Sequence, residues 1–503
     1  MPSIPVKTCL SFLPASQTEL NGILKETYSA DLIELRLDHL NNIPFSDIRK
    51  SFKQPVIITL RMPEEGGFWK HTSEKRIPLF QAALDSGMDY IDLEWKYSQS
   101  ILDGLVLKDK SKVILSHHTN ERNFDKLLDI YEQMKKNPAD IYKLIFTAND
   151  INDNLVALQL QQTLKDDAGK FIIHAMGEPG KISRILGALR GNTWTYVSQD
   201  SVTETASGQL SVNEFNAYYL AEKSSHTRII GLVGYPIAQS FGWILHNKLT
   251  HICKQKMGET FSPEKDFIYL NFPVIDFHNL WEKWKDIISG LSITIPHKEK
   301  VTLVADVVSP EVQSSGVCNT ILKRDDKWYG HNTDYLAIAD LLKPYLEKLR
   351  EGVLIIGTGG TARTSIAVLK EFGIESVFIT GRNEERGLEL SRKFSVSFLS
   401  QDELAGQHFA GMIQTTPVGM YPKVDEIPGE AKLLKPGQIV LDVIFNPAKT
   451  EFLKAAEKLG CKIISGRDMY LNQAWRQFQL FSGLEIDFYL VENAAREIWG
   501  NLE

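Results

Sequence analysis

The sequence contains few of the features that mark secreted or metal-binding proteins. Only four cysteines occur in 503 residues, Cys9, Cys253, Cys318 and Cys461, and no two of them form a CxxC pair. A disulfide framework or a cysteine zinc site is therefore not expected, and a reducing compartment is the default. The twelve histidines include no HExxH motif and no clustered ligand spacing, so we predict no metal site.

Long apolar runs and an excess of positive charge are absent as well. No stretch of about 18 apolar residues occurs, so we expect no transmembrane helix. The first residues, MPSIPVKTCLSFLP, lack the basic region and apolar core of a signal peptide, so we expect a cytoplasmic protein. Lys and Arg total 56 against 63 Asp and Glu, and the net charge of -7 argues against a nucleic-acid or membrane partner. Small anionic molecules remain compatible with local basic sites.

The composition that is present is that of a globular protein, with 43% hydrophobic and 24% charged residues. A chain of this length is expected to fold into about two to four domains. Residues 221–227, AEKSSHT, are short, polar and unpatterned, and they separate a helical stretch from a fresh apolar run. We place the main domain boundary there.

Eight apolar runs in the first 220 residues are separated by helical patterns such as RNFDKLLDIYEQMKK. Most are rich in Val, Ile and aromatic residues, as strands are. Alternating strands and helices imply a parallel sheet, and eight such units of this total length fit an α/β fold of the (β/α)8 TIM-barrel type. The runs are Val6–Leu13, Leu32–Asp38, Pro55–Arg61, Tyr90–Trp95, Lys112–His118, Ile141–Phe146, Phe171–Met176 and Thr193–Ser198.

Ionisable side chains interrupt several of these runs, mostly near their carboxyl ends. A barrel interior is normally filled by apolar side chains, and its chemistry lies at the carboxyl-terminal mouth. One such residue alone is compatible with an exposed strand end or a satisfied core polar group, but the whole set predicts an active site at the mouth. The set is Glu34, Arg36, Arg61, Glu94, His117, His118 and Lys143.

Lys143 is the most informative of these residues, because it stands between Ile141 and Ile145 on one strand face. A lysine in an apolar interior is costly unless it is paired or neutral. Burial and nearby cations such as Arg61 and Arg184 would favour the neutral amine, which can attack a ketone to form an imine. The alternative is an outward-facing strand lysine with its amine in water.

The first half resembles the type I 3-dehydroquinate dehydratase family, in the family's order and over nearly its whole length. The resemblance implies that Lys143 forms a Schiff base with the ring ketone of 3-dehydroquinate. It also implies that His118 is the general acid/base, that Glu65 orients it, and that Arg184 holds the substrate carboxylate. The matching segments are ELRLD (34–38), TLRMPEEGG (59–67), IDLEW (91–95), SHH (116–118), ADIYKLIF (139–146), MGEPGKISRILG (176–187) and ASGQLSV (206–212).

The same resemblance implies that further residues bind the ring hydroxyls of the substrate or shape its site. These are Glu34, Arg36, Arg61, Thr205 and Gln209. His117 competes with His118, but adjacent strand residues point to opposite faces, so only one of them can line the barrel mouth. The motif favours His118. Where the family usually has a proline, this chain has Ser207, so loop closure could differ.

The second half restarts as α/β, and residues 352–469 read as a doubly wound nucleotide-binding unit. GTGGTAR (357–363) follows the apolar run VLII and opens a helix, where glycines allow close approach to a phosphate. Arg382 follows the next apolar run, at the place where an NAD site usually has an acid, and therefore predicts NADP. Arg386 lies one turn further on. A plain turn and a solvated arginine are the alternatives.

This half resembles shikimate dehydrogenase along most of its length. The resemblance implies that Lys298 is the catalytic acid/base with Asp334 as its partner, although a surface salt bridge would also explain that pair. The shared segments are GYPIAQS (234–240), SITIPHK (292–298), GVCNT (316–320), GHNTD (330–334), TTPVGM (415–420), DVIFNPAKT (442–450) and MYLNQA (469–474).

Binding roles follow from the same resemblance. The substrate would be bound by Ser240, Thr294, Asn319 and Gln473. NADP would be held by Gly357, Gly359, Gly360, Thr361, Ala362, Arg363, Gly381, Arg382, Asn383 and Thr415.

The second half departs from the family's pattern at the expected carboxylate site. Gly242 and Trp243 replace the usual second serine and proline, so one carboxylate hydrogen bond would be missing. This bears on affinity and on which ring acid is preferred. Phe445 replaces a common tyrosine, and Gln414 replaces a usual asparagine.

Together the two halves predict two consecutive reactions of the shikimate pathway. Residues 1–222 would dehydrate 3-dehydroquinate to 3-dehydroshikimate. Residues 228–335, completed by helices over 470–503, would bind 3-dehydroshikimate, and residues 336–469 would bind the NADPH that reduces it to shikimate. A catabolic quinate/shikimate dehydrogenase fusion and a non-catalytic metabolite sensor are the alternatives. The presence of Lys143, His118, Lys298 and Asp334 argues against a sensor.

Overall fold

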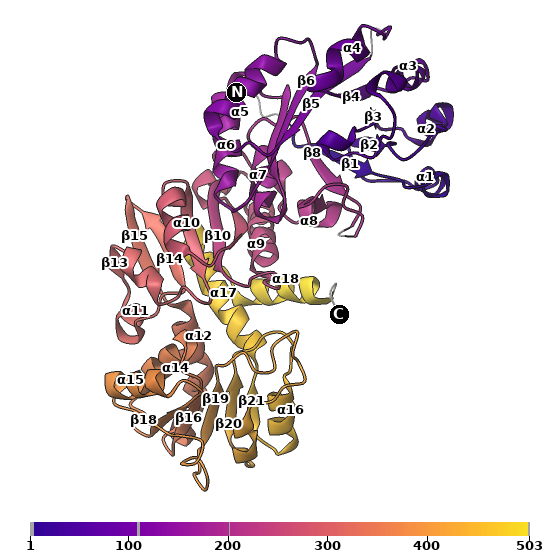
Figure 1. Cartoon of the computed structure of the whole chain (residues 1–503). Helices are drawn as coiled ribbons and strands as arrows, with labels where there is room; N and C mark the ends of the chain where they lie inside the picture. Colours follow the sequence, from indigo (N-terminus) through magenta and orange to yellow (C-terminus); the bar gives the residue numbers. More distant parts are fainter. Residues whose placement is uncertain (1–4, 108–110, 201, 501–503) are drawn as a thin grey trace. The chain divides into compact units, whose positions relative to one another are not determined.

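The computed structural model describes residues 5–107, 111–200 and 202–500. The chain divides into two compact units, residues 1–227 and residues 228–503 (Figure 1). In the described ranges, no helix combines the length and the apolar character that crossing a membrane requires.

The first unit is a parallel β-sheet curled into a barrel, with helices alternating with its strands along the chain (Figure 1). The strand order is β7-β6-β5-β4-β3-β2-β1-β8-β9, which confirms the predicted barrel. The strands are β1 Thr8–Phe12, β2 Leu32–Arg36, β3 Val56–Thr59, β4 Tyr90–Glu94, β5 Lys112–Thr119, β6 Ile141–Thr147, β7 Phe171–Met176, β8 Thr195–Ser198 and β9 Leu210–Ser211. The helices are α1 Gln17–Ile23, α2 Phe45–Ser51, α3 Ile77–Asp85, α4 Ser98–Leu102, α5 Phe124–Met134, α6 Asp153–Thr163, α7 Lys181–Gly187 and α8 Val212–Asn216.

The barrel closes between β7 and β8 through an isolated bridge from Phe171 to Asn192. Thr193 N donates to the Phe171 carbonyl at 2.9 Å. The Asn192 side chain accepts from Ile173 N at 2.9 Å and so replaces part of a strand ladder. A polar side chain therefore completes the seam beside β7.

The strands bury both faces, which explains their continuous apolar runs. Outward residues such as Leu115, Leu144 and Phe146 pack against the helices. Inward residues at the amino-terminal ends of the strands form a separate apolar cluster that includes Cys9, Leu32, Ile57, Ile114 and Ile141.

Two residues further along each strand, the inward positions become polar. Glu34 follows Leu32, Ser116 follows Ile114 and Lys143 follows Ile141, and all three polar side chains are buried. Because side chains alternate with a period of two along a strand, an apolar floor and a polar layer above it result.

The first sheet of the second unit is mixed, with strand order β11-β10-β12-β14-β15-β13. Strand β12 pairs in parallel with β10 but antiparallel with β14. The strands are β10 Arg228–Gly234, β11 Phe267–Pro273, β12 Ile288–Ile293, β13 Val307–Val308, β14 Thr320–Arg324 and β15 Lys327–His331. The helices before the second sheet are α9 Gly242–Met257, α10 Phe277–Trp284, α11 Pro310–Ser315, α12 Thr333–Leu342 and α13 Leu346–Leu349.

The second sheet of this unit is parallel, in the order β18-β17-β16-β19-β20-β21. This is the doubly wound order in which ligands bind where the strand order reverses, here between β16 and β19, and it confirms the predicted Rossmann-type fold. The strands are β16 Val353–Ile356, β17 Val377–Thr380, β18 Ser397–Phe398, β19 Gly411–Gln414, β20 Ile439–Asp442 and β21 Lys462–Ile464. The helices are α14 Gly360–Glu371, α15 Glu384–Phe394 and α16 Glu451–Lys458.

The last two helices, α17 Gly466–Ser482 and α18 Phe488–Gly500, return to the first sheet of this unit (Figure 1). Phe478 and Val491 belong to the same buried cluster as Ile230 and Tyr269. The C-terminal helices therefore share a core with β10, β11 and α9.

Candidate active sites

A cavity of about 230 Å³ lies inside the barrel, and its lining includes inward side chains from β2, β5, β6 and β7. His174, Met176, Tyr196 and Ser207 line it as well. The structure brings together around this cavity every residue that the sequence placed in the first site: Glu34, Arg36, Arg61, Glu65, His118, Lys143, Arg184, Thr205 and Gln209.

Lys143 points into the barrel and is 6% exposed. Its Nζ donates to Asp92 Oδ2 at 3.0 Å and lies 3.7 Å from Glu34 Oε1. The same nitrogen lies 4.2 Å from the centre of the Tyr196 ring. The cations near this amine were predicted from the sequence, but these two carboxylates, which balance positive charge at the nitrogen, were not.

Asp92 is the residue of this site that the sequence argument did not name. It accepts from Ser116 Oγ at 2.6 Å and lies 3.0 Å from Arg61 Nη2. Burial raises the pKa of Asp92, but the charges of Arg61 and Lys143 outweigh burial and bring that pKa well below its usual range. A signal was present, because Asp92 stands two residues before Glu94 and alternation puts both on one strand face.

Glu65 holds both candidate histidines at the cavity edge. Its Oε2 lies 3.0 Å from His118 Nδ1 and accepts from His118 N at 3.1 Å, and its Oε1 lies 3.2 Å from His117 Nδ1. Burial raises the pKa of Glu65, but hydrogen bonds from the two imidazoles outweigh it and bring the pKa to about 2. Burial and the Arg61 charge lower the pKa of His118 to about 4. At neutral pH the imidazole is therefore a free base beside an anionic partner.

His117 does not line the cavity. Its ring contacts the edge of the Trp95 ring at 5.7 Å between centroids. Alternation thus separates the two side chains as expected, although both still reach Glu65.

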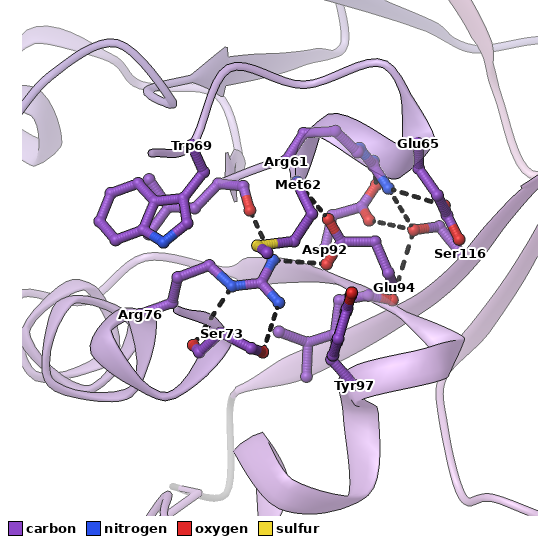
Figure 2. Close-up of polar contacts among 12 residues, drawn as sticks. Arg61, Met62, Glu65, Trp69, Ser73, Arg76, Asp92, Glu94, Tyr97 and Ser116 are labelled. Atoms are coloured by element: carbon purple, nitrogen blue, oxygen red, sulfur yellow. Dashed lines mark hydrogen bonds and ion pairs between the residues drawn. The ribbon is translucent and has the colours of Figure 1, made fainter. Parts of the chain in front are cut away.

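A buried ion pair anchors the turn that carries Glu65 (Figure 2). Arg76 Nη1 donates to Glu94 Oε2 at 2.5 Å and to the Leu60 carbonyl at 2.7 Å. The other Glu94 oxygen accepts from Met62 N at 2.7 Å, at the start of the turn. Both side chains are almost fully buried, at 0% and 1% exposure.

Arg184 is a buried cation that forms no ion pair with any residue in the described ranges. It is 2% exposed, and its Nη2 donates to the Ser207 carbonyl at 3.3 Å. Burial lowers its pKa to about 10. A buried charge without a counter-ion is costly, so an anion entering the cavity would be stabilised here.

A cavity of about 580 Å³ in the second unit carries the second set of predicted residues. His246, Tyr269, Phe445, Tyr470 and Gln477 also line it. The predicted residues brought together are Ser240, Thr294, Lys298, Asn319, Asp334, Thr361 and Gln473.

Lys298 follows β12, and Asp334 lies in the first turn of α12, whose cap Asn332 accepts from Tyr335 N. Lys298 Nζ donates to Asp334 Oδ2 at 2.5 Å. The side chains are 17% and 7% exposed, so this is a half-enclosed pair at the cavity wall rather than a surface salt bridge.

A side-chain network fixes the polar wall of this cavity. Asn319 accepts from Thr333 N at 2.8 Å, and Thr333 Oγ1 lies 3.5 Å from Gln473. Gln477 donates to Thr320 Oγ1 and accepts from Ser292 Oγ, both at 2.9 Å. Gln473 was predicted from the sequence, whereas Gln477 was not. The two residues are four apart in α17 and therefore share one face of the helix.

The departure at Gly242 leaves space beside Ser240. A Cβ at Gly242 would lie 3.4 Å from Ser240 Oγ and 3.7 Å from the Tyr269 hydroxyl, which are ordinary contacts. Phe445 stacks on Tyr470 at 5.1 Å between centroids. The buried Tyr470 hydroxyl has no hydrogen-bond partner among the residues that the structure describes.

The glycine turn after β16 lies at the reversal of strand order. Gly357 has φ +121°, and a Cβ there would lie 2.4 Å from Thr415 Oγ1, so only glycine fits. Thr415 Oγ1 donates to the Ile356 carbonyl at 2.8 Å. The turn leads directly into α14, whose first residues are Gly360, Thr361, Ala362 and Arg363.

A further hollow of about 290 Å³ is lined by Arg363, Asn383, Arg386 and three glutamates. Glu299 lies 3.4 Å from Arg363 Nη1 and accepts from Arg386, and Glu389 accepts from Arg363 at 2.8 Å. Arg382 is exposed and does not line this hollow. The structure therefore groups Arg363 with Arg386, and leaves Arg382 in solvent.

Comparison with known proteins gives two family matches. The model for type I 3-dehydroquinase matches residues 9–225. The model for the shikimate dehydrogenase substrate binding domain matches residues 232–321.

Similar proteins combine both descriptions. A chloroplastic bifunctional 3-dehydroquinate dehydratase/shikimate dehydrogenase of Arabidopsis thaliana is 32% identical over 487 residues, covering 90% of this chain and 78% of that protein. A shikimate dehydrogenase (NADP(+)) of Maridesulfovibrio salexigens is 31% identical over 277 residues, covering 54% of this chain and 96% of that one. The solved dehydroquinate dehydratase and shikimate dehydrogenase of S. pombe AroM is 22% identical, with 98% of both chains covered and a TM-score of 0.42.

Proposed function

The chain belongs to the family of bifunctional 3-dehydroquinate dehydratases/shikimate dehydrogenases, and from that premise we propose how its own residues perform the two reactions. The first unit dehydrates 3-dehydroquinate to 3-dehydroshikimate. The second unit reduces 3-dehydroshikimate to shikimate with NADPH.

In the first unit, Lys143 condenses with the ring ketone and releases water, which leaves a protonated imine. The imine draws electrons and so acidifies the adjacent carbon. His118 takes a proton from that carbon and returns one to the leaving hydroxyl, which departs as water. Hydrolysis of the imine then frees the product and the amine. Glu65 keeps the imidazole oriented and stabilises its protonated form.

The charges around Lys143 support this sequence of steps. Asp92 and Glu34 lie within ion-pair distance of the Lys143 nitrogen, so an iminium formed at that nitrogen has a counter-ion beside it. Arg184, which has no anionic partner among the described residues, takes the substrate carboxylate.

In the second unit, the glycine turn at Gly357 and the arginines of the neighbouring hollow fit a dinucleotide with an additional phosphate. Gly357 admits the backbone close to Thr415. Arg363 and Arg386 are paired with Glu299 and Glu389, and they would exchange these carboxylates for a phosphate of the dinucleotide. NADPH bound there supplies the hydride. Lys298 donates a proton to the ketone oxygen, and Asp334 holds the ammonium in place.

The observation that carries the first reaction is the position of the Lys143 amine, inside a closed barrel and on the same cavity as His118 and Arg184. Borohydride reduction in the presence of 3-dehydroquinate, followed by peptide mass spectrometry, tests it. We expect an irreversible, substrate-dependent mass gain on the peptide that contains Lys143.

Two variants complete the test. Lys143→Ala should abolish both trapping and dehydration, whereas Lys170→Ala, which removes an exposed lysine at the start of a neighbouring strand, should leave both unchanged. Wild-type turnover in Lys143→Ala would refute the imine mechanism.

A further inference from the structure

His174 is a buried titratable residue that the mechanism above leaves without a role. It is 4% exposed on β7 and lines the same cavity as Lys143. Its imidazole has no hydrogen-bond partner among the residues that the structure describes. An imidazole has two nitrogens that need hydrogen-bond partners when it is buried, so His174 can form a hydrogen bond with a ligand in the cavity.

Strand register places His174 in the same layer as His118, on the other side of the strand that carries Lys143. His118 pairs with Ile145, and Ile145 pairs with His174, so the three lie in one layer of β5, β6 and β7. Lys143 lies one layer below Ile145 on the same inward face. Two strand spacings separate the two histidine backbones by about 9–10 Å, and both side chains line the cavity on either side of Ile145.

The charges near His174 indicate which part of the ring it meets. Among the charges that act on His174, the buried Arg184, which forms no ion pair with a residue in the described ranges, has the largest effect, followed by Lys143 and His118. Burial, then these three groups, lower the pKa of His174 well below its usual range, so its imidazole is neutral at neutral pH. A neutral imidazole donates one N–H and is a suitable second donor to an anion held by Arg184.

We propose that His174 is a substrate-binding residue of the dehydratase site, which donates a hydrogen bond to the ring carboxylate beside Arg184. This inference rests on the proposed function of the first unit. It gives that site two imidazoles with different tasks: His118 moves protons on one flank of the ring, and His174 positions the carboxylate on the other.

The test compares His174→Leu, which removes the donor, with His174→Gln, which retains an N–H near the position of Nε2. Because a hydrogen bond to a charged group is lost, we expect His174→Leu to raise the KM for 3-dehydroquinate about tenfold or more, with kcat within about twofold of wild type. His174→Gln should recover most of the KM. Ile145→Val, in the same layer, controls for repacking and should change neither constant appreciably.

A second measurement keeps the inference testable if packing changes. The methyl ester of 3-dehydroquinate lacks the negative charge, so the ratio of acid to ester affinity should fall about tenfold in His174→Leu. Unchanged KM and an unchanged ratio would overturn the inference, as would a fall in kcat alone. Absence of borohydride trapping in the wild type would instead refute the proposed function itself.

Discussion

The ionisation of His118 is decided by its immediate neighbours. Burial and Arg61 favour the neutral ring more strongly than Glu65 favours the charged one, and its pKa falls to about 4. A histidine that acts as a base at neutral pH must be unprotonated, and this environment keeps it so.

This makes a prediction about the pH profile of dehydration. Protonation of His118 removes the base, so kcat/KM should fall only as pH approaches about 4 and should change little between pH 5 and 7. Dehydratase activity assayed after return to neutral pH controls for irreversible acid unfolding of the barrel. An acid limb with its midpoint near 6.5, the ordinary value, would contradict the assignment.

Gly242 allows the substrate site of the second unit to be tested by one added hydroxyl. Gly242→Ser should lower the KM for shikimate about tenfold, because the new hydroxyl can donate to the carboxylate and its Cβ meets only ordinary contacts. Gly242→Ala adds the Cβ without the donor and should not lower KM. A higher KM in both variants would show that the space beside Ser240 is needed by the ligand.

At the scale of the element, the turn between β3 and α3 depends on a charge pair buried beneath it (Figure 2). Arg76 reaches Glu94 and the Leu60 carbonyl, and Glu94 holds Met62 N. This turn presents Glu65 to His118. The pair therefore acts on the histidine through backbone position and not through contact with substrate.

Breaking this pair should destabilise the barrel strongly. Arg76→Met leaves the buried Glu94 carboxylate with its hydrogen bond from Met62 N but without a cation, and we expect a loss of about 3–5 kcal/mol in the free energy of unfolding. Urea denaturation followed by dehydratase activity measures it. Lys135→Ala removes a half-exposed pair with Asp167 and should cost less than about 1 kcal/mol. Equal losses in the two variants would argue against the anchoring role.

The barrel strands show how much could be predicted at this scale. Their apolar runs give continuous local signals, because both faces are buried, and the predicted ranges overlap all eight strands from β1 to β8. Their ends agree to within two residues, and those of β7 agree at both ends. The closure of the barrel at Asn192 could not be predicted from an apolar run, because a side chain there replaces backbone pairing.

At the scale of the whole molecule, the two units have separate cores and separate cavities. The predicted catalytic groups of each reaction line one cavity within one unit. The limits of the three domains that were predicted from the sequence remain predictions.

Separate sites make a prediction about mixing. Lys143→Ala should lose dehydration and retain shikimate dehydrogenation, and Lys298→Ala should do the reverse. An equimolar mixture of the two should convert 3-dehydroquinate to shikimate after a lag, because the intermediate can pass through solvent. Formation of shikimate is followed by NADPH absorbance. Failure of the mixture, with each single activity intact, would show that the sites must belong to one chain.

The sequence by itself determined the fold classes and the two reactions, and the residues that it predicted for each site remain predictions, although most of them line one of the two cavities. These follow from local periodicity, turn chemistry and motifs, which neighbouring residues carry. Only the tertiary structure decided which charges meet. Asp92 reaches Lys143, His174 shares a layer with His118, and Glu299 holds Arg386 because strand register and loop packing bring distant residues together. Such partners depend on non-local geometry, which no single segment encodes.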